Sequence, residues 1–100
     1  MYEESIVDSI DPIIAAGLAD FVEMDHKLTD EIYIQPTPGH TPGHVSVVIR
    51  SAGKQAIITG DIMHHPCQME HPRWECTFDW NREAAEATRE RMLAQFADED

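Results

Sequence analysis

Residues 37–44 read TPGHTPGH, the same tetrapeptide twice, and this stretch restricts the fold more than any other part of the chain. Proline fixes one backbone angle and has no N–H to donate, while glycine adopts angles that other residues avoid, so no helix can run through the repeat. Each copy instead predicts a rigid turn with a histidine at its tip. His40 and His44 are therefore expected in turns just ahead of a strand, with His40 at the edge of the sheet.

A β-hairpin is predicted directly after the repeat. Residues 44–50, HVSVVIR, alternate as a strand does, SAGK supplies a turn with its glycine, and residues 55–59, QAIIT, form the apolar return strand. On the first strand, one face carries Val45, Val47 and Ile49, and the other carries Ser46 and Arg50. The return strand runs into Gly60 and Asp61, so Asp61 is expected at a point of the sheet edge comparable to that of His40.

His40 and Asp61 offer a neutral imidazole nitrogen and a carboxylate oxygen, which are both good ligands for zinc, iron or manganese. Taken singly, a histidine in a turn is more often a surface residue, and an aspartate after glycine is more often a turn former. The order of a turn histidine, a hairpin and Gly-Asp is far more specific than its parts. A carboxylate can also bridge two metal ions through its two oxygens.

The segment before the repeat predicts one helix and two short strands. Pro12 predicts a kink or a restart in the helix, with Asp11 as its N-cap and Gly17 as its terminator. Short strands are predicted at residues 20–25 and 31–35. The apolar residues spaced for one face of the helix are Ile6, Ile10, Ile13, Ile14 and Leu18.

The segment after Asp61 predicts a long loop and a final helix. The stretch from Ile62 to Trp80 has no periodicity, and loops of that length tend to carry function. Its cysteines, Cys67 and Cys76, are expected to be free and partly buried, with a disulfide as the alternative. Asn81 is the expected N-cap of the helix. The buried stripe of this helix is predicted to hold Ala85, Thr88, Met92 and Phe96.

Charge limits the partners of the chain. In 100 residues, 7 Lys and Arg stand against 19 Asp and Glu, for a formal net charge of −12. Such a surface repels phosphate backbones and anionic lipid, which argues against nucleic acid and membrane as partners. The chain has no apolar run long enough to cross a membrane, and MYEES is no signal peptide, so a cytoplasmic location is expected.

The stretch TPGHTPGHVSVVIRSAGKQAIITGDIMHHP resembles the third and fourth metal-binding motifs of the metallo-β-lactamase superfamily. The resemblance is closest to the branch that holds quorum-sensing lactonases and organophosphate-hydrolysing relatives. FDWNREAAEATRERML resembles the helix that follows in that branch, and the N-terminal helix fits the region just ahead. The resemblance implies an α/β fold, the second half of an αββα sandwich, over residues 1–100.

The same resemblance implies a metal-dependent hydrolase that acts on a small-molecule substrate. His40 would bind metal, Asp61 would bridge two divalent ions, and His44 would support the site rather than bind metal. Zinc is expected, with iron or manganese as alternatives. The two metal ions would activate a hydroxide for attack on an ester, lactone or phosphoester.

The chain departs from the family pattern in two places. The upstream His-x-His-x-Asp-His motif is absent. The last metal-binding histidine of the family normally follows the final helix, and residues 1–100 do not reach it. The resemblance therefore implies a C-terminal portion of a larger domain, without the front half and the final strand. Such a piece is expected to bind metal weakly, to be inactive alone, and to self-associate or aggregate through an apolar face and an open strand edge.

The sequence allows more than one role for several residues near the predicted metal site. Thr41 or His44 could orient Asp61. His64 and His65 could orient Asp61, contact substrate or donate a proton, or they could be polar loop residues with local hydrogen bonds. Three aromatic residues could line an apolar pocket or pack beneath the loop: Trp74, Phe78 and Trp80.

Two other functions remain open from the sequence. The same scaffold hosts iron-based oxidoreductases, which metal analysis and oxygen consumption would distinguish from hydrolases. A non-catalytic interaction module is the second alternative, and cooperative folding of residues 1–100 without metal would favour it.

Overall fold

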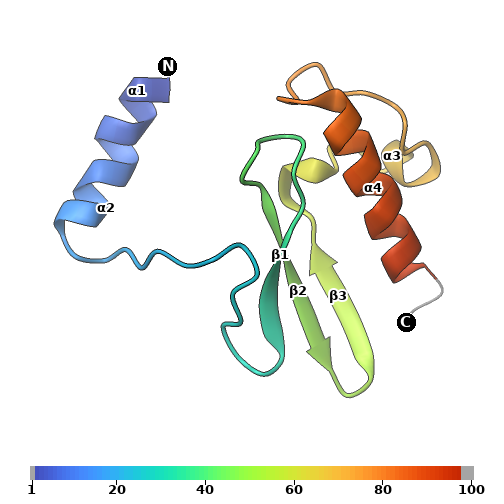
Figure 1. The fold of residues 1–100 in the computed structure, drawn as a ribbon, viewed down its shortest axis with the longest axis horizontal. Helices are drawn as coiled ribbons and strands as arrows, with labels where there is room; N and C mark the ends of the chain where they lie inside the picture. The colour runs from blue at the N-terminus through green and yellow to red at the C-terminus, as the bar shows by residue number, and fades with distance from the viewer. Residues whose placement is uncertain (1, 98–100) are drawn as a thin grey trace.

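The computed structural model describes residues 2–97, which form an antiparallel sheet with a helix along one face (Figure 1). The strands are β1 (Ile32–Pro36), β2 (Val45–Ser51) and β3 (Lys54–Ile58), in the order β1-β2-β3. The repeated tetrapeptide connects β1 to β2. The predicted strand before the repeat and the predicted hairpin after it are therefore confirmed, with boundaries that differ by one residue.

The N-terminal helix is continuous but changes its winding ahead of the proline. It comprises α1 (Tyr2–Ser5), the π-helical turn η1 (Ile6–Ile10) and α2 (Asp11–Ala15). Proline lacks an N–H and its ring crowds the preceding turn, which accounts for the wider turn there. The expected N-cap at Asp11 is wrong, because the backbone is already helical at Ile10 and offers no break for a cap.

The end of this helix is the one predicted. Gly17 adopts a φ of +70°, its N–H donates to the Ile14 carbonyl over 3.0 Å, and the Leu18 N–H donates to the Ile13 carbonyl over 3.1 Å. This pair of bonds is the Schellman motif, in which glycine stops a helix because its left-handed backbone costs nothing. Gly17 is confirmed as the terminator.

The N-terminal segment stands apart from the sheet (Figure 1). Residues 3–31 are all exposed, including the apolar stripe of the helix. The strand expected at residues 20–25 is wrong: the segment is irregular, and the adjoining Lys27 makes only an isolated bridge to Tyr33. Without a partner for its backbone groups, an apolar segment of this kind does not form a strand.

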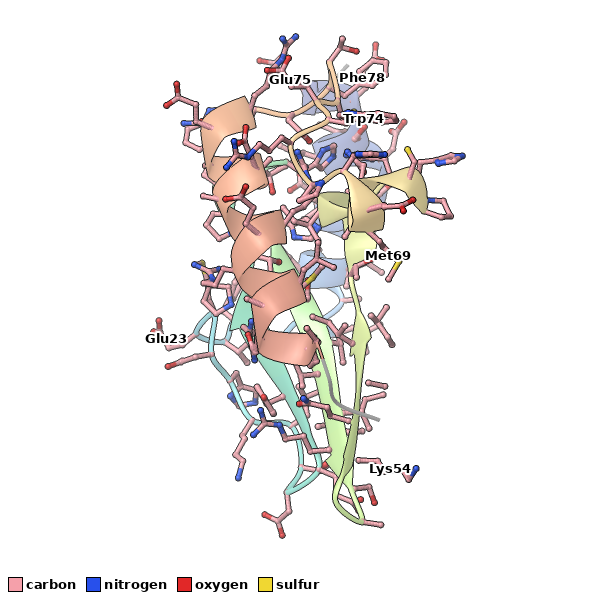
Figure 2. The ribbon with its side chains drawn as sticks, turned by 90° about the vertical axis from the view of Figure 1, so that its right-hand side faces the viewer. Glu23, Lys54, Met69, Trp74, Glu75 and Phe78 are labelled. Carbon is pink, nitrogen blue, oxygen red and sulfur yellow. The ribbon has the colours of Figure 1, made fainter. Side chains whose placement is uncertain are left out.

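The last helix, α4 (Arg82–Phe96), covers one face of the sheet (Figures 1 and 2). Asn81 is confirmed as its N-cap, because its Oδ1 accepts the Ala84 N–H over 3.0 Å. The predicted stripe is also found, with Phe96 only half-buried. The residues of the stripe that are fully buried are Ala85, Thr88 and Met92, and Arg89 is buried beside them.

The two faces of the sheet differ in cover. Ser46 and Val48, on the face beneath α4, are 1% and 0% exposed. The opposite face is lined by half-buried apolar residues, because no described element packs over it: Val45, Val47 and Ile49. The alternation along β2 is as predicted, but helix cover makes the polar side of the strand the buried one. Self-association through the uncovered face stays a prediction.

The loop from Ile62 to Trp80 holds more structure than its sequence indicates. It begins in the 3₁₀ turn η2 (Gly60–Ile62) and contains the short helix α3 (Cys67–Glu70). Both cysteines are free and half-buried, as expected. The three loop aromatics are exposed: Trp74 at 55% and Phe78 at 83% (Figure 2), and Trp80 at 60%. Trp74 stacks on the ring of His71 at a centroid distance of 4.1 Å.

Among the helices that the structure describes, none is both long and apolar enough to cross a membrane.

The turn between β2 and β3 allows a test of stability. Ala52 and Gly53 have φ values of +52° and +76°, which match a type I′ turn, and alanine pays a steric cost at such an angle. Ala52→Asn should therefore raise the free energy of unfolding by about 1 kcal/mol, measured by urea denaturation. Ala52→Ser, which lacks the tolerance of asparagine for this angle, should stay within about 0.5 kcal/mol. Equal stability of the two variants would contradict the assignment of strain.

Candidate metal centre

The two predicted metal ligands lie at the same edge of the sheet. β1 and β3 both run antiparallel to β2, so they are parallel to each other and end at the same side. His40 follows β1, Asp61 follows β3, and the distance between His40 Nε2 and Asp61 Oδ2 is 3.7 Å. The Asp61 side chain is 70% exposed, so its carboxylate is open to a ligand.

A second carboxylate, which the sequence pattern did not single out, holds the other nitrogen of His40. His40 Nδ1 lies 3.0 Å from Asp79 Oδ1, and His64 Nε2 lies 3.2 Å from the same oxygen. The Asp79 side chain is 0% exposed. It comes from the aperiodic loop, so neither periodicity nor spacing could pair it with a histidine 39 residues away.

The buried carboxylate of Asp79 is accompanied by a buried cation. Arg89 is 0% exposed, and its Nη1 lies 3.6 Å from Asp79 Oδ2, which makes an ion pair but no hydrogen bond. Arg89 also donates to three carbonyl oxygens of the loop, at distances of 2.8 to 3.3 Å: those of Ile62, Pro72 and Trp74. The arginine thus neutralises the carboxylate and fastens the loop to α4.

His44 supports Asp61 through the backbone rather than through the carboxylate. Its Nε2 accepts the Asp61 N–H over 3.0 Å, and a Cβ at Gly60 would lie 2.9 Å from this nitrogen, so the position needs glycine. Burial lowers the pKa of the His44 imidazole below its ordinary value, while the Asp61 carboxylate opposes that effect. The lowered pKa favours the neutral imidazole, which is the form that can accept this hydrogen bond.

The direction of each hydrogen bond beneath His44 follows from that acceptor. Because Nε2 accepts, Nδ1 carries the proton and donates to Thr37 Oγ1 over 2.8 Å. The Thr37 hydroxyl then donates to Ser46 Oγ over 2.9 Å, and the Ser46 hydroxyl donates to the Thr59 carbonyl over 3.0 Å. This chain of bonds gives a reason for the burial of two polar residues, Thr37 just after β1 and Ser46 on β2.

The other candidates take different places. The Thr41 carbonyl accepts the N–H groups of Gly39 and His44 across the repeat, so Thr41 shapes the turn through its backbone. His65 Nδ1 accepts the Cys67 N–H over 3.1 Å, a local loop bond. His64, in contrast to His65, takes part in the cluster around the buried Asp79 carboxylate, because its Nε2 contacts the same Asp79 oxygen as His40.

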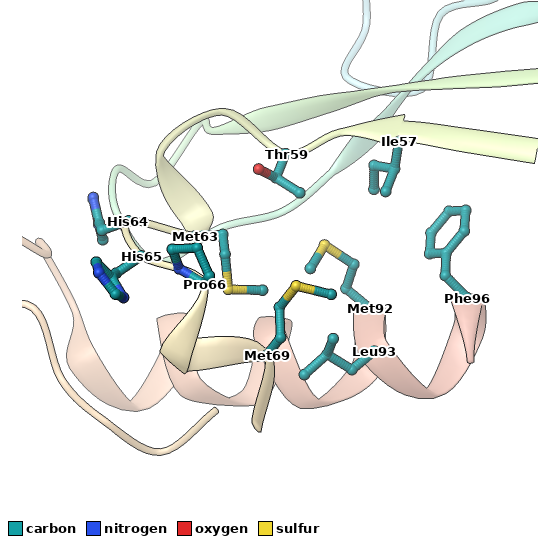
Figure 3. Close-up of a pocket in the computed structure, with 10 residues that line it drawn as sticks. All are labelled: Ile57, Thr59, Met63, His64, His65, Pro66, Met69, Met92, Leu93 and Phe96. Atoms are coloured by element: carbon teal, nitrogen blue, oxygen red, sulfur yellow. The ribbon is translucent and has the colours of Figure 1, made fainter. Parts of the chain in front are cut away.

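An apolar pocket of about 360 Å³ opens next to these histidines (Figure 3). β3, the loop, α3 and α4 line it, with Met63, Met69 and Met92 at its centre and His64 and His65 at one end. The exposed loop aromatics do not line it. The chain therefore offers an apolar cavity beside the polar cluster.

The donors fit a divalent metal ion. With Nδ1 engaged by Asp79, His40 presents Nε2 toward the exposed carboxylate of Asp61, and nitrogen and oxygen donors of this kind suit zinc, iron or manganese. His40, His64 and Asp79 also lie within 4.8 Å of one another. That second cluster is less suited to a cation, because Arg89 already supplies the positive charge beside Asp79.

Comparison with known proteins places the chain in a family. A family model described as the metallo-beta-lactamase superfamily matches residues 11–96. The crystal structure of the hydrolase AbOPH, of the beta lactamase superfamily, matches at a TM-score of 0.82 and 29% identity, over 94% of this chain and 32% of that one. No match was found among curated proteins.

Two more distant structures share the fold. A probable metal-dependent hydrolase from Staphylococcus aureus matches at a TM-score of 0.75 and 23% identity, over 95% of this chain and 37% of that one. AidC, a dizinc quorum-quenching lactonase, matches at a TM-score of 0.70 and 22% identity, over 94% and 36%. At these identities, the likeness supports the fold alone.

The fold and the site define an α/β protein in which a histidine and an aspartate, residue types that can bind metal, meet at one edge of the sheet. The chain belongs to the metallo-β-lactamase superfamily. It spans about a third of the length of the structures that it matches.

Proposed function

We propose that the protein carrying this chain is a metal-dependent hydrolase that acts on a small ester, lactone or phosphoester. The supporting observation is the 3.7 Å approach of His40 Nε2 to Asp61 Oδ2 at one sheet edge, in a chain of this superfamily. When bound, divalent ions would supply Lewis acidity and a water-derived nucleophile near neutral pH. Zinc is the favoured ion, and the site would hold two of them with Asp61 shared.

The residues of this chain have separate tasks in that proposal. His40 offers Nε2 to the metal, and Asp61 offers an exposed carboxylate. The Asp61 backbone N–H donates to His44 Nε2, which fixes the backbone position from which the Asp61 carboxylate extends. The remaining metal ligands are expected outside residues 1–100, with this chain as the C-terminal portion of the domain.

The apolar pocket supports a substrate that carries a hydrocarbon group. Its methionine lining adapts to different shapes, because methionine is unbranched and flexible. Among the structures that match, AidC is described as a quorum-quenching lactonase and AbOPH as a hydrolase. An N-acyl lactone and an aryl phosphotriester are the first substrates to test, because the sequence resembles the branch of lactonases and organophosphate-hydrolysing relatives.

The test measures metal content and hydrolysis in the protein as its gene encodes it. Metal analysis should find a divalent ion, and hydrolysis of an N-acyl lactone, an aryl ester or a phosphotriester should disappear with a chelator and return with Zn²⁺. Hydrolysis that persists without metal would contradict the proposal. Bound iron together with oxygen consumption, and no hydrolysis, would favour an oxidoreductase instead.

A further inference from the structure

A buried hydrogen-bond network surrounds the nitrogen of His40 that faces away from Asp61. Asp79 Oδ1 lies 3.0 Å from His40 Nδ1, and the carboxylate is wholly buried. An ionised carboxylate only accepts hydrogen bonds, so this contact requires the proton of a neutral His40 to be on Nδ1. The lone pair is then on Nε2, the nitrogen that faces Asp61.

Asp79 is held in place from both sides. On its side-chain side, Arg89 pairs with Oδ2 and is itself fixed by three loop carbonyls. On its backbone side, the Trp80 N–H donates to the His40 carbonyl over 3.0 Å, and the Asn81 N–H donates to the Gly39 carbonyl over 2.9 Å. The backbone after Asp79 is thus fastened to the backbone around His40, which holds the two residues next to each other.

We propose that Asp79 is a positioning residue for the metal centre: it selects the Nδ1–H tautomer of His40 and fixes the ring so that Nε2 faces Asp61. This inference rests on the proposed function for its metal-binding consequence, while the tautomer is a property of the metal-free chain. A carboxylate behind a metal-binding imidazole orients the ring and raises its basicity. Arg89 supports Asp79 and acts on His40 only through it.

The first experiment reads the tautomer directly. Nitrogen-15 correlation spectra of the metal-free protein distinguish Nδ1–H from Nε2–H imidazoles, and the His40→Gln spectrum assigns the signal. We expect the wild-type His40 to be the Nδ1–H tautomer. An Nε2–H tautomer for the neutral ring would overturn the proposal, whatever the metal content of the protein.

The second experiment measures affinity for Zn²⁺ in the chelator-treated protein. Asp79→Asn should weaken zinc binding by about 10- to 100-fold, because the amide can donate to Nδ1 and move the proton to Nε2. Glu75→Gln is the matched control: it removes an exposed carboxylate of the same loop, whose ion-pair partner among the described residues is Arg82, so affinity should not change. Unchanged affinity in Asp79→Asn would overturn the proposal.

The two experiments separate the inference from the proposed function. A wild-type protein that binds no divalent ion contradicts the proposed function, and the tautomer then decides the Asp79 assignment alone. If Asp79→Asn does not fold, because Arg89 is left buried without a carboxylate to neutralise its charge, the wild-type tautomer again decides. Loss of zinc affinity without any change of tautomer would reduce Asp79 to a structural residue and overturn its positioning role.

Discussion

Asp61→Ala should remove at least one metal ion per molecule and lower kcat/KM by on the order of a thousandfold, which is about 4 kcal/mol of transition-state stabilisation. Asp61 is the exposed carboxylate at the sheet edge, and alanine leaves His40 Nε2 without its partner. The backbone N–H that donates to His44 is kept in alanine. The fold should therefore survive while the metal centre is lost.

His40→Ala should have a similar effect on metal content with a larger effect on stability. Removal of the imidazole leaves the buried Asp79 carboxylate with one histidine partner in place of two. Asp25→Ala is the control for charge, because it removes an exposed carboxylate from the N-terminal segment. Metal analysis and initial rates decide the outcome: near-full metal content and activity in Asp61→Ala or His40→Ala would contradict the assignment of these ligands.

Local patterns were sufficient to predict the frame of this site. The proline and glycine residues of the repeat place turns, alternation identifies β2, and Gly-Asp marks the end of the return strand, all within residues 37–61. Because β1 and β3 end at the same edge, these local elements are enough to bring His40 and Asp61 within 3.7 Å. No long-range information was needed for that step.

The buried network behind His40 could not be predicted in the same way. Asp79 lies in an aperiodic loop, and its contact with His40 depends on how α4 docks on the sheet. Arg89 occupies a buried position of α4, where sequence reasoning expects apolar residues, because three carbonyls and a carboxylate receive its guanidinium. A buried charge has no periodic signature, because only its tertiary partners make it tolerable.

The sequence made no prediction of which face of the sheet is buried, for a related reason. Ser46 is more deeply buried than Val45 and Val47, which flank it on β2, and its hydroxyl is one link in the hydrogen-bond chain below His44. Alternation reveals that a strand has two faces, but it does not reveal which face a helix will cover. That choice is made by α4, whose Thr88 hydroxyl donates to the Pro38 carbonyl over 2.6 Å.

Gly39→Ala should destabilise the protein by about 3 kcal/mol or more, whereas Gly43→Ala should change its stability by no more than about 0.5 kcal/mol. The two glycines occupy the same position in the two copies of TPGH. A Cβ on Gly39 would overlap the backbone of Ala85 and lie 2.7 Å from its Cβ, and the φ of Gly39 is +144°. A Cβ on Gly43 would meet no atom within 4 Å.

The comparison isolates the docking of α4, because both substitutions add the same methyl group to the same tetrapeptide. At Gly39 the methyl group must push the first turns of α4 away, which strains the bond from the Asn81 N–H to the Gly39 carbonyl and separates His40 from Asp79. Urea denaturation measures the loss of stability, and zinc affinity should fall with it in the Gly39 variant alone. Equal stability of the two variants would mean that α4 does not pack against Gly39 in the first TPGH turn. The contacts that bring Asp79 and Arg89 to His40 would then lack this support.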